Sequence, residues 1–310
     1  MSLVTVDPGI ARTRFLKDAF TLRHALAGHP LFSLARLVDL AKSMPRDRIE
    51  YNSGKVSVDV KPEDVPKIDR PAEDVIQSIE TASAWMVIKN VETDPDYLAL
   101  LKAFVEDANR AAGKQPGDYS DLQGFIFVSS ANATTPFHID AEENILIQIR
   151  GDKFVRTFDN RDRTLISEED MEISPSKHRN QKYEAWYEER ATLHALKPGD
   201  ALHMPYMIPH WVSTGESYSI SMAMTWKTPE VLRLNKIRLM NGTLRRFGLP
   251  QKPPGASPAM DAIKVFGHDA MRAIIDPLRK SETLRRILRG LIYGRKANYY
   301  YDTKPKQAGM

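Results

Sequence analysis

The stretch that decides the fold is Thr134-Thr135-Pro136-Phe137-His138-Ile139-Asp140-Ala141-Glu142-Glu143-Asn144-Ile145-Leu146-Ile147-Gln148-Ile149-Arg150-Gly151-Asp152-Lys153. Read as a β-strand, it directs His138 and Asp140 to the same side, because side chains alternate between faces with a period of two. An imidazole and a carboxylate held side by side are two of the three ligands of a facial metal site. The missing ligand should be another histidine on a neighbouring strand. The candidate is His210, which follows the turn Pro198-Gly199-Asp200 and a short strand.

Two histidines and one carboxylate with open coordination positions suit non-haem Fe(II) that reacts with O₂. A His-x-Asp motif alone is a weak signal, because three-residue matches arise by chance. Its weight here comes from the further residues that stand in register with it. His194 and His203 lie near His210 in the sequence, and we predict structural roles for both.

Together the two stretches resemble the jumonji-C (cupin-type) family of Fe(II)- and 2-oxoglutarate-dependent oxygenases, and within it the asparaginyl hydroxylases. The matching positions cover roughly residues 121–226. The resemblance implies an all-β core with helical flanks, a double-stranded β-helix of the cupin or jelly-roll type, followed by C-terminal helices. It also implies that His138, Asp140 and His210 bind Fe(II).

The same resemblance assigns residues to the cosubstrate. In the family, a Thr three residues before the first His and a Lys fifteen residues after it bind the distal carboxylate of 2-oxoglutarate. These positions are Thr135 and Lys153 here. Asn144 and Gln148 also match the pattern, as groups near the cofactors or substrate, or as ordinary strand polarity. The family places a polar Asn at about the position of Met224, so the sequence departs from the pattern there.

Outside this stretch, hydrophobic spacing predicts helices over residues 9–45, 94–112, 229–247 and 259–296, a hairpin over 48–60, and a buried strand over Trp85–Ile88. Gly151-Asp152 predicts that Ile145–Ile149 and Phe154–Phe158 pair as a hairpin. The polar residues 160–190 are predicted to be an inserted loop that governs substrate choice. The predicted domains are an oxygenase core over residues 1–228 and a basic helical region over residues 229–310.

Composition limits the possible classes of protein. The 310 residues include no cysteine, which excludes disulfides and thiolate metal sites. No apolar run approaches the ~18 residues of a membrane span, and the N-terminus lacks the apolar core of a signal peptide, so a cytoplasmic location is predicted. Residues 227–310 carry eighteen Lys and Arg against six Asp and Glu, whereas the preceding residues are acidic on balance.

These observations predict a hydroxylase whose substrate is a protein side chain, an RNA base or a small metabolite, with demethylation a less expected outcome. The alternative is a catalytically silent cupin that binds a ligand or regulates a partner. Apolar residues at helical spacing between Leu278 and Lys296, with arginines opposite, predict an amphipathic helix. We expect a homodimer through the C-terminal helices, and weak contact of the basic face with RNA or anionic lipid.

Overall fold

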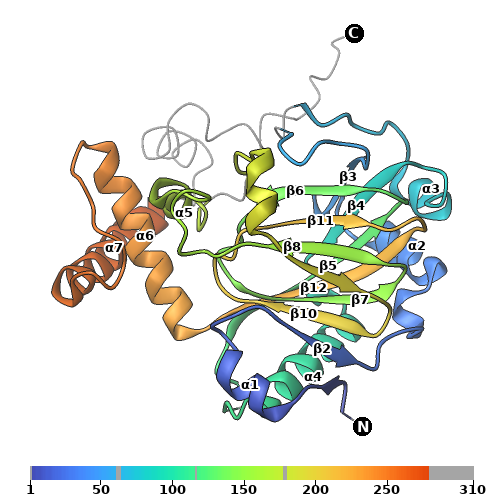
Figure 1. The fold of residues 1–310 in the computed structure, drawn as a ribbon, viewed down its shortest axis with the longest axis horizontal. Helices are drawn as coiled ribbons and strands as arrows, with labels where there is room; N and C mark the ends of the chain where they lie inside the picture. The colour runs from blue at the N-terminus through green and yellow to red at the C-terminus, as the bar shows by residue number, and fades with distance from the viewer. Residues whose placement is uncertain (1, 61–63, 116, 177–179, 279–310) are drawn as a thin grey trace. The chain divides into compact units, whose positions relative to one another are not determined.

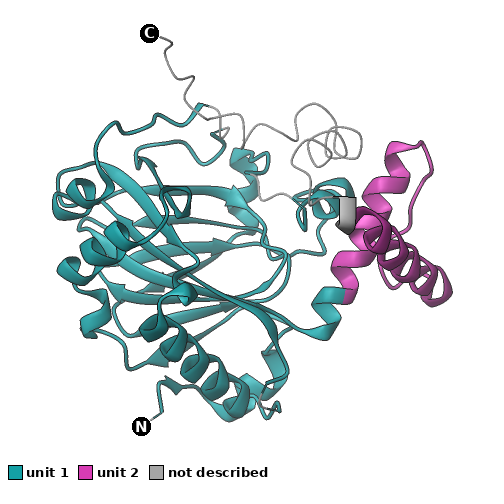
Figure 2. Cartoon of the chain, turned by 180° about the vertical axis from the view of Figure 1, so that it is seen from behind, with its two compact units in different colours: residues 1–232 teal, residues 233–310 magenta. Residues whose placement is uncertain are grey.

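The computed structural model describes residues 2–60, 64–115, 117–176 and 180–278 (Figure 1). The chain divides into two compact units, residues 1–232 and 233–310 (Figure 2). The strands are β1 (Val4–Thr5), β2 (Phe20–His24), β3 (Ile49–Ser53), β4 (Ala84–Lys89), β5 (Ser120–Ser129), β6 (Thr134–His138), β7 (Glu143–Arg150), β8 (Lys153–Thr157), β9 (Thr192–Leu196), β10 (Asp200–Met204), β11 (His210–Thr214) and β12 (Ser219–Lys227). The α-helices are α1 (Pro8–Arg14), α2 (Leu34–Ser43), α3 (Ala72–Gln77), α4 (Pro95–Ala111), α5 (Glu168–Ile173), α6 (Pro229–Arg246) and α7 (Pro258–Leu278).

The strands form two antiparallel sheets. The larger sheet has the order β1-β2-β10-β7-β12-β5-β4-β3, and the smaller one has the order β6-β11-β8-β9. Successive strands alternate between the two sheets from β5 to β8 and again from β9 to β12, whereas β8 and β9 pair within the smaller sheet (Figure 1). This path is that of a double-stranded β-helix, so the predicted jelly-roll core with helical flanks is confirmed.

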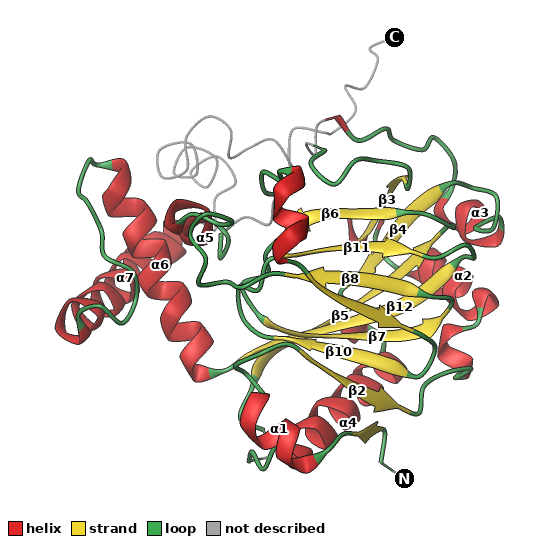
Figure 3. Ribbon diagram, in the orientation of Figure 1, coloured by secondary structure: helices red, strands yellow, loops and turns green. Residues whose placement is uncertain are grey.

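The two faces of the larger sheet are buried against different partners. Its outer face packs on α1 to α4, which Figure 3 shows in red. Its inner face meets the smaller sheet through a compact apolar layer: Leu146, Val155, Leu196, Leu202, Met204, Val212 and Ala223. Because side chains alternate along a strand, β7 turns Asn144, Leu146 and Gln148 inward and its three isoleucines outward.

The predicted hairpin across Gly151-Asp152 is wrong. β7 pairs with β10 and β12 in the larger sheet, whereas β8 pairs with β9 and β11 in the smaller one. The connection is therefore a corner between sheets. Gly151 has φ +69°, and a Cβ there would lie 2.4 Å from the carbonyl oxygen of Tyr218, so only glycine fits this corner.

Two predictions for the N-terminal region are also wrong. Residues 9–45 are not all helical, because Phe20–His24 forms β2 and pairs with β10. Residues 48–60 do not form a hairpin, because β3 pairs with β4 instead. The predicted strand at Trp85–Ile88 and the helices near 94–112 and 229–247 are confirmed. The predicted helix over 259–296 is confirmed as far as Leu278, and its remainder lies outside the described residues.

The insertion between β8 and β9 packs on the outer face of the smaller sheet. Its core joins Phe137 and Phe158 to Leu165 and Tyr187. Tyr183 of the insertion packs edge-on against Phe137 with ring centroids 5.3 Å apart. These aromatic rings therefore support the insertion. None of the described helices has the length and apolarity needed to cross a lipid bilayer.

Candidate metal centre and cosubstrate site

His138 and His210 lie directly opposite each other on paired strands, at the end of β6 and the start of β11. Their ring centroids are 4.1 Å apart. Asp140, in the turn after β6, places Oδ1 4.0 Å from His138 Nε2 and Oδ2 3.9 Å from His210 Nε2. All the candidate ligand atoms lie within 4.8 Å of one another. A single metal ion could bind all three side chains.

Both imidazoles are held by backbone carbonyls through the nitrogen that faces away from the centre. His138 Nδ1 lies 2.7 Å from the carbonyl oxygen of Pro136, and His210 Nδ1 lies 3.0 Å from that of Ile208. A carbonyl can only accept, so each Nδ1 carries the hydrogen and each Nε2 keeps its lone pair. This tautomer is the one that a metal ligand requires.

The Asp140 turn is fixed by two further contacts. Asn144 Nδ2 donates to Asp140 Oδ2 at 3.1 Å, which orients the carboxylate. The Met207 amide donates to the Asp140 carbonyl oxygen at 2.9 Å and thereby joins the turns that precede β7 and β11. Met207 is fully buried with φ +60°, a backbone conformation that costs energy for a residue with a side chain.

Lys153 begins β8 and points between the sheets. Its side chain is buried, its ammonium donates to Ser221 Oγ, and Nζ lies 5.5 Å from the centre of the Phe127 ring. Burial lowers the pKa of Lys153 to about 7, because no carboxylate in the described chain offsets the loss of water around the ammonium. A buried ammonium group that contacts only a hydroxyl group and an aromatic ring among the described residues is suited to bind an anionic ligand.

Thr135 reaches the same interior through an irregularity in strand pairing. Thr135 and His138 are three residues apart and would face opposite sides of a regular strand. The β6–β11 register shifts between His210 and Val212, so the step from Thr135 to His138 on β6 lies opposite a step of two residues on β11. Thr135 Oγ1 then accepts a hydrogen bond of 2.9 Å from Trp85 Nε1. The Trp85 ring lies 5.9 Å from the Phe127 ring, which in turn neighbours Lys153.

Two buried polar atoms face the centre without a partner in the described chain, Asn144 Oδ1 and Thr225 Oγ1. Their residues are directly paired on β7 and β12. Met224, where the resemblance suggested a departure, belongs to the outer core, and its neighbour Thr225 occupies the inward position. These open polar atoms, the facial triad and Lys153 together fit a metal ion and a bound oxo-acid.

Gln148, expected near the cofactors or substrate or as ordinary strand polarity, is fully buried, and its Oε1 has no hydrogen-bond partner among the described residues. Its Nε2 donates to the carbonyl oxygens of Arg150 and Gly151, each at 2.7 Å, and to Ser219 Oγ at 3.0 Å. The amide nitrogen therefore closes the corner between the sheets and has no capacity left for a ligand.

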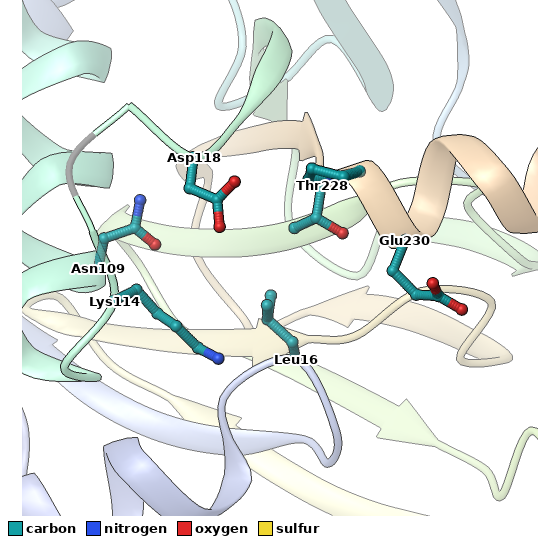
Figure 4. Close-up of a pocket in the computed structure, with 7 residues that line it drawn as sticks. Leu16, Asn109, Lys114, Asp118, Thr228 and Glu230 are labelled. Atoms are coloured by element: carbon teal, nitrogen blue, oxygen red, sulfur yellow. The ribbon is translucent and has the colours of Figure 1, made fainter.

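The other histidines near His210 lie outside the triad. His203 points to the outer core, between Phe15 and Phe20, with Nε2 3.6 Å from Glu143 Oε2. His194 Nε2 lies 3.0 Å from Thr157 Oγ1. A separate hollow of about 340 Å³ is lined by Asn109, Lys114 and Thr228, among others, and includes no residue of the triad (Figure 4).

Trp85 and Ser221 contact the predicted clamp residues Thr135 and Lys153, and the sequence did not reveal either contact. Ser221 lies in the alternating polar series Ser219, Ser221 and Thr225 of β12, and this alternation was the available signal. Trp85 carried no comparable signal, because its contact with Thr135 joins strands fifty residues apart.

Fold and site define a cupin barrel that carries a facial group of two histidines and one aspartate. The chain belongs to the family of cupin-like domains, whose model matches residues 37–230. No curated protein matches it by sequence.

Solved structures share the fold at low sequence identity. The structure of Escherichia coli YcfD is 16% identical, with a TM-score of 0.51 over 93% of this chain and 72% of that one. The same bacterial protein, described as a ribosomal oxygenase in complex with cobalt and 2-oxoglutarate, is 17% identical, with a TM-score of 0.49 over 87% of this chain and 68% of that one.

Proposed function

We propose that the protein is an Fe(II)- and 2-oxoglutarate-dependent oxygenase that acts as a hydroxylase. The observation that supports this most strongly is the presence of two features inside one barrel. His138, Asp140 and His210 form a facial ligand group, and the buried Lys153 lies in the same interior with no carboxylate partner among the described residues. Neither feature is needed to stabilise the barrel, whereas the two together are suited to bind a metal ion and a dicarboxylate coordinated to it.

A catalytically silent cupin would account for the barrel but would not account for a lysine buried inside it. Burying an ammonium group costs free energy, and the lowered pKa of Lys153 records that cost. A purely structural position would favour an apolar side chain there. A binding-only protein that recognises a dicarboxylate would share the lysine, so turnover separates it from an oxygenase.

Each residue has a role that follows from its position. The two Nε2 atoms and the Asp140 carboxylate would hold Fe(II), and Asn144 keeps the carboxylate oriented. Lys153 and Thr135 would hold the distal carboxylate of 2-oxoglutarate by charge-assisted hydrogen bonds, and the one from the ammonium joins two opposite charges. When bound, metal and cosubstrate supply the oxidative chemistry with O₂. The apolar layer between the sheets excludes water around them.

For the primary substrate, we propose three classes: a protein side chain, an RNA base or a small metabolite. A screen of peptides, RNA and metabolites for a mass gain of one oxygen distinguishes the classes. Loss of a methyl group would instead show demethylation.

The metal assignment is tested with three variants, His138→Ala, Asp140→Ala and His210→Ala. Each should lose metal binding and succinate release from 2-oxoglutarate while it remains folded, because two ligands hold the ion much less tightly than three. Metal content, circular dichroism and succinate are the measurements. His194→Ala is the matched control, since its ring bonds Thr157 outside the triad. Full turnover in His210→Ala would contradict the assignment.

A further inference from the structure

The hydroxyl group of Thr135 is oriented by Trp85. An indole N–H can only donate, so the bond of 2.9 Å from Trp85 Nε1 uses the Thr135 oxygen as acceptor. The hydrogen of the Thr135 hydroxyl must then point away from the indole. In the described part of the chain it meets no protein acceptor within hydrogen-bond distance. Trp85 thus leaves Thr135 as a donor toward the interior.

The hydroxyl group of Ser221 accepts a hydrogen bond from Lys153, as that of Thr135 does from Trp85. The ammonium donates to Ser221 Oγ, and an ammonium has no lone pair with which to accept in return. Ser221 is fully buried, and its hydroxyl hydrogen likewise has no acceptor among the described residues. Each of the two hydroxyl oxygens therefore accepts from a nitrogen donor, and each hydroxyl hydrogen lacks an acceptor among the described residues.

An aromatic pair connects these two arrangements. The Trp85 ring lies 5.9 Å from the Phe127 ring at an angle of 49°, and Lys153 Nζ lies 5.5 Å from the centre of the Phe127 ring. Ser221 is paired with Phe127 across β12 and β5. The same ring pair thus contacts Thr135 through Trp85 and lies beside Lys153 and Ser221. Lys153, Thr135 and Ser221 thus lie around one aromatic wall, Trp85 and Phe127, and no carboxylate of the described residues pairs with Lys153.

We propose that the chain binds the distal carboxylate of its dicarboxylate cosubstrate through three donors, Lys153, Thr135 and Ser221, and that Trp85 is the residue that positions Thr135. The proposal rests on the proposed oxygenase function and deepens it. Ser221 contacts the carboxylate directly, whereas Trp85 acts only through the Thr135 hydroxyl.

The test measures binding by calorimetry on protein loaded with Co(II), which avoids turnover. Two ligands are compared: 2-oxoglutarate, and oxalate, which has no distal carboxylate. Trp85→Phe and Ser221→Ala should each weaken 2-oxoglutarate roughly tenfold, the scale of one hydrogen bond to a charged group, and leave oxalate unchanged. Trp186→Phe is the matched control, because that indole lies in the insertion.

A double-variant cycle separates positioning from general packing. If Trp85 acts through Thr135, Trp85→Phe should change the affinity for 2-oxoglutarate less than about twofold in a Thr135→Val background. Additive effects would contradict the role of Trp85. Thr135→Ser keeps the hydroxyl and should keep the full effect of Trp85→Phe, which provides a second measurement if Thr135→Val folds poorly.

The outcomes also separate this proposal from the function itself. Wild-type protein that binds Co(II) but no 2-oxoglutarate would overturn both. Loss of 2-oxoglutarate binding in Lys153→Ala, with wild-type affinity in Trp85→Phe and Ser221→Ala, would overturn only the three-donor clamp. Equal loss of oxalate and 2-oxoglutarate in the two variants would overturn it as well, since the effect would not concern the distal carboxylate.

Discussion

Lys153 makes the stability of the protein depend on pH in a defined direction. Burial lowers its pKa from 10.5 to about 7, so between these values the unfolded chain binds more protons than the folded one. The free energy of unfolding should therefore rise with pH across this window in the absence of ligand. Lys153→Met should remove that rise, and the exposed Lys55→Met should keep it. Urea unfolding at several pH values measures both; an unchanged slope in Lys153→Met would contradict the assignment.

The same ammonium should govern cosubstrate affinity. Lys153→Ala should weaken 2-oxoglutarate by ~1.5–3 kcal/mol and leave metal binding largely intact. Wild-type affinity should fall as the pH rises above about 7, because the free protein then loses the proton that the carboxylate requires. Titration calorimetry across pH tests both statements. Arg156 lies on the opposite face of β8 from Lys153, where it forms an ion pair of 2.5 Å with Glu188 and lies over the Trp211 ring.

At the residue scale, the sequence was sufficient to bring His138, Asp140 and His210 together as candidates, because further residues in register with the His-x-Asp motif match the pattern of a known family. Ser221 was not found, since its partner Lys153 lies sixty-eight residues away. The role of Thr135 depends on a shifted strand register, which no local pattern encodes. Contacts of this kind become visible only when the sheets are placed against each other.

At the scale of elements, Phe137 is the residue on which the insertion depends. It is fully buried on the outer side of β6, next to His138 on the inner side, and packs edge-on against Phe158, Tyr183 and Tyr187. Phe137→Ala should lower the free energy of unfolding by about 3–5 kcal/mol. It should also increase hydrogen exchange within residues 160–176 and 180–190 first. Leu193→Ala, at an exposed position of β9, is the control.

An intact insertion in Phe137→Ala, with hydrogen exchange unchanged, would show that the insertion's own contacts are sufficient to hold it.

The elements that the sequence predicted wrongly have identifiable physical causes. A tight turn between two apolar runs predicts a hairpin, but Gly151 turns the chain out of one sheet into the other. β2 alternates buried and exposed residues over only five positions, which the helical spacing of the surrounding leucines obscured.

At the scale of the whole molecule, we propose that the chain forms a homodimer through its C-terminal helices. Helix α7 exposes Met260, Ile263, Phe266 and Ile274, a run of large apolar side chains that water disfavours. Phe266→Asp and Ile274→Asp should therefore shift the protein toward the monomer, as should truncation after Lys227. Light scattering measures the mass, and Ala262→Asp is a control at another exposed position of the same helix. A monomeric wild-type protein would contradict the proposal.

The basic charge of residues 227–310 supports a second proposal, weak binding to RNA or anionic lipid. Binding of either should fall steeply between low and physiological salt, because counterion release dominates such contacts. Filter binding with RNA and sedimentation with anionic vesicles, each at two salt concentrations, distinguish the two partners. An affinity that is the same at both salt concentrations would mean that the positive charge of residues 227–310 does not cause the binding.

The site draws its parts from both sheets. The metal ligands and Lys153 come from the smaller sheet and its turns, whereas Trp85 and Ser221 belong to the larger one. The separation of the two halves is set by the seven apolar side chains between the sheets. That layer is therefore a spacer as well as a core. A substitution in this layer such as Leu202→Val would change the distance between the metal ligands and the carboxylate clamp without contacting either. Mutations in the layer therefore change the stability of the barrel and its affinity for the cosubstrate together.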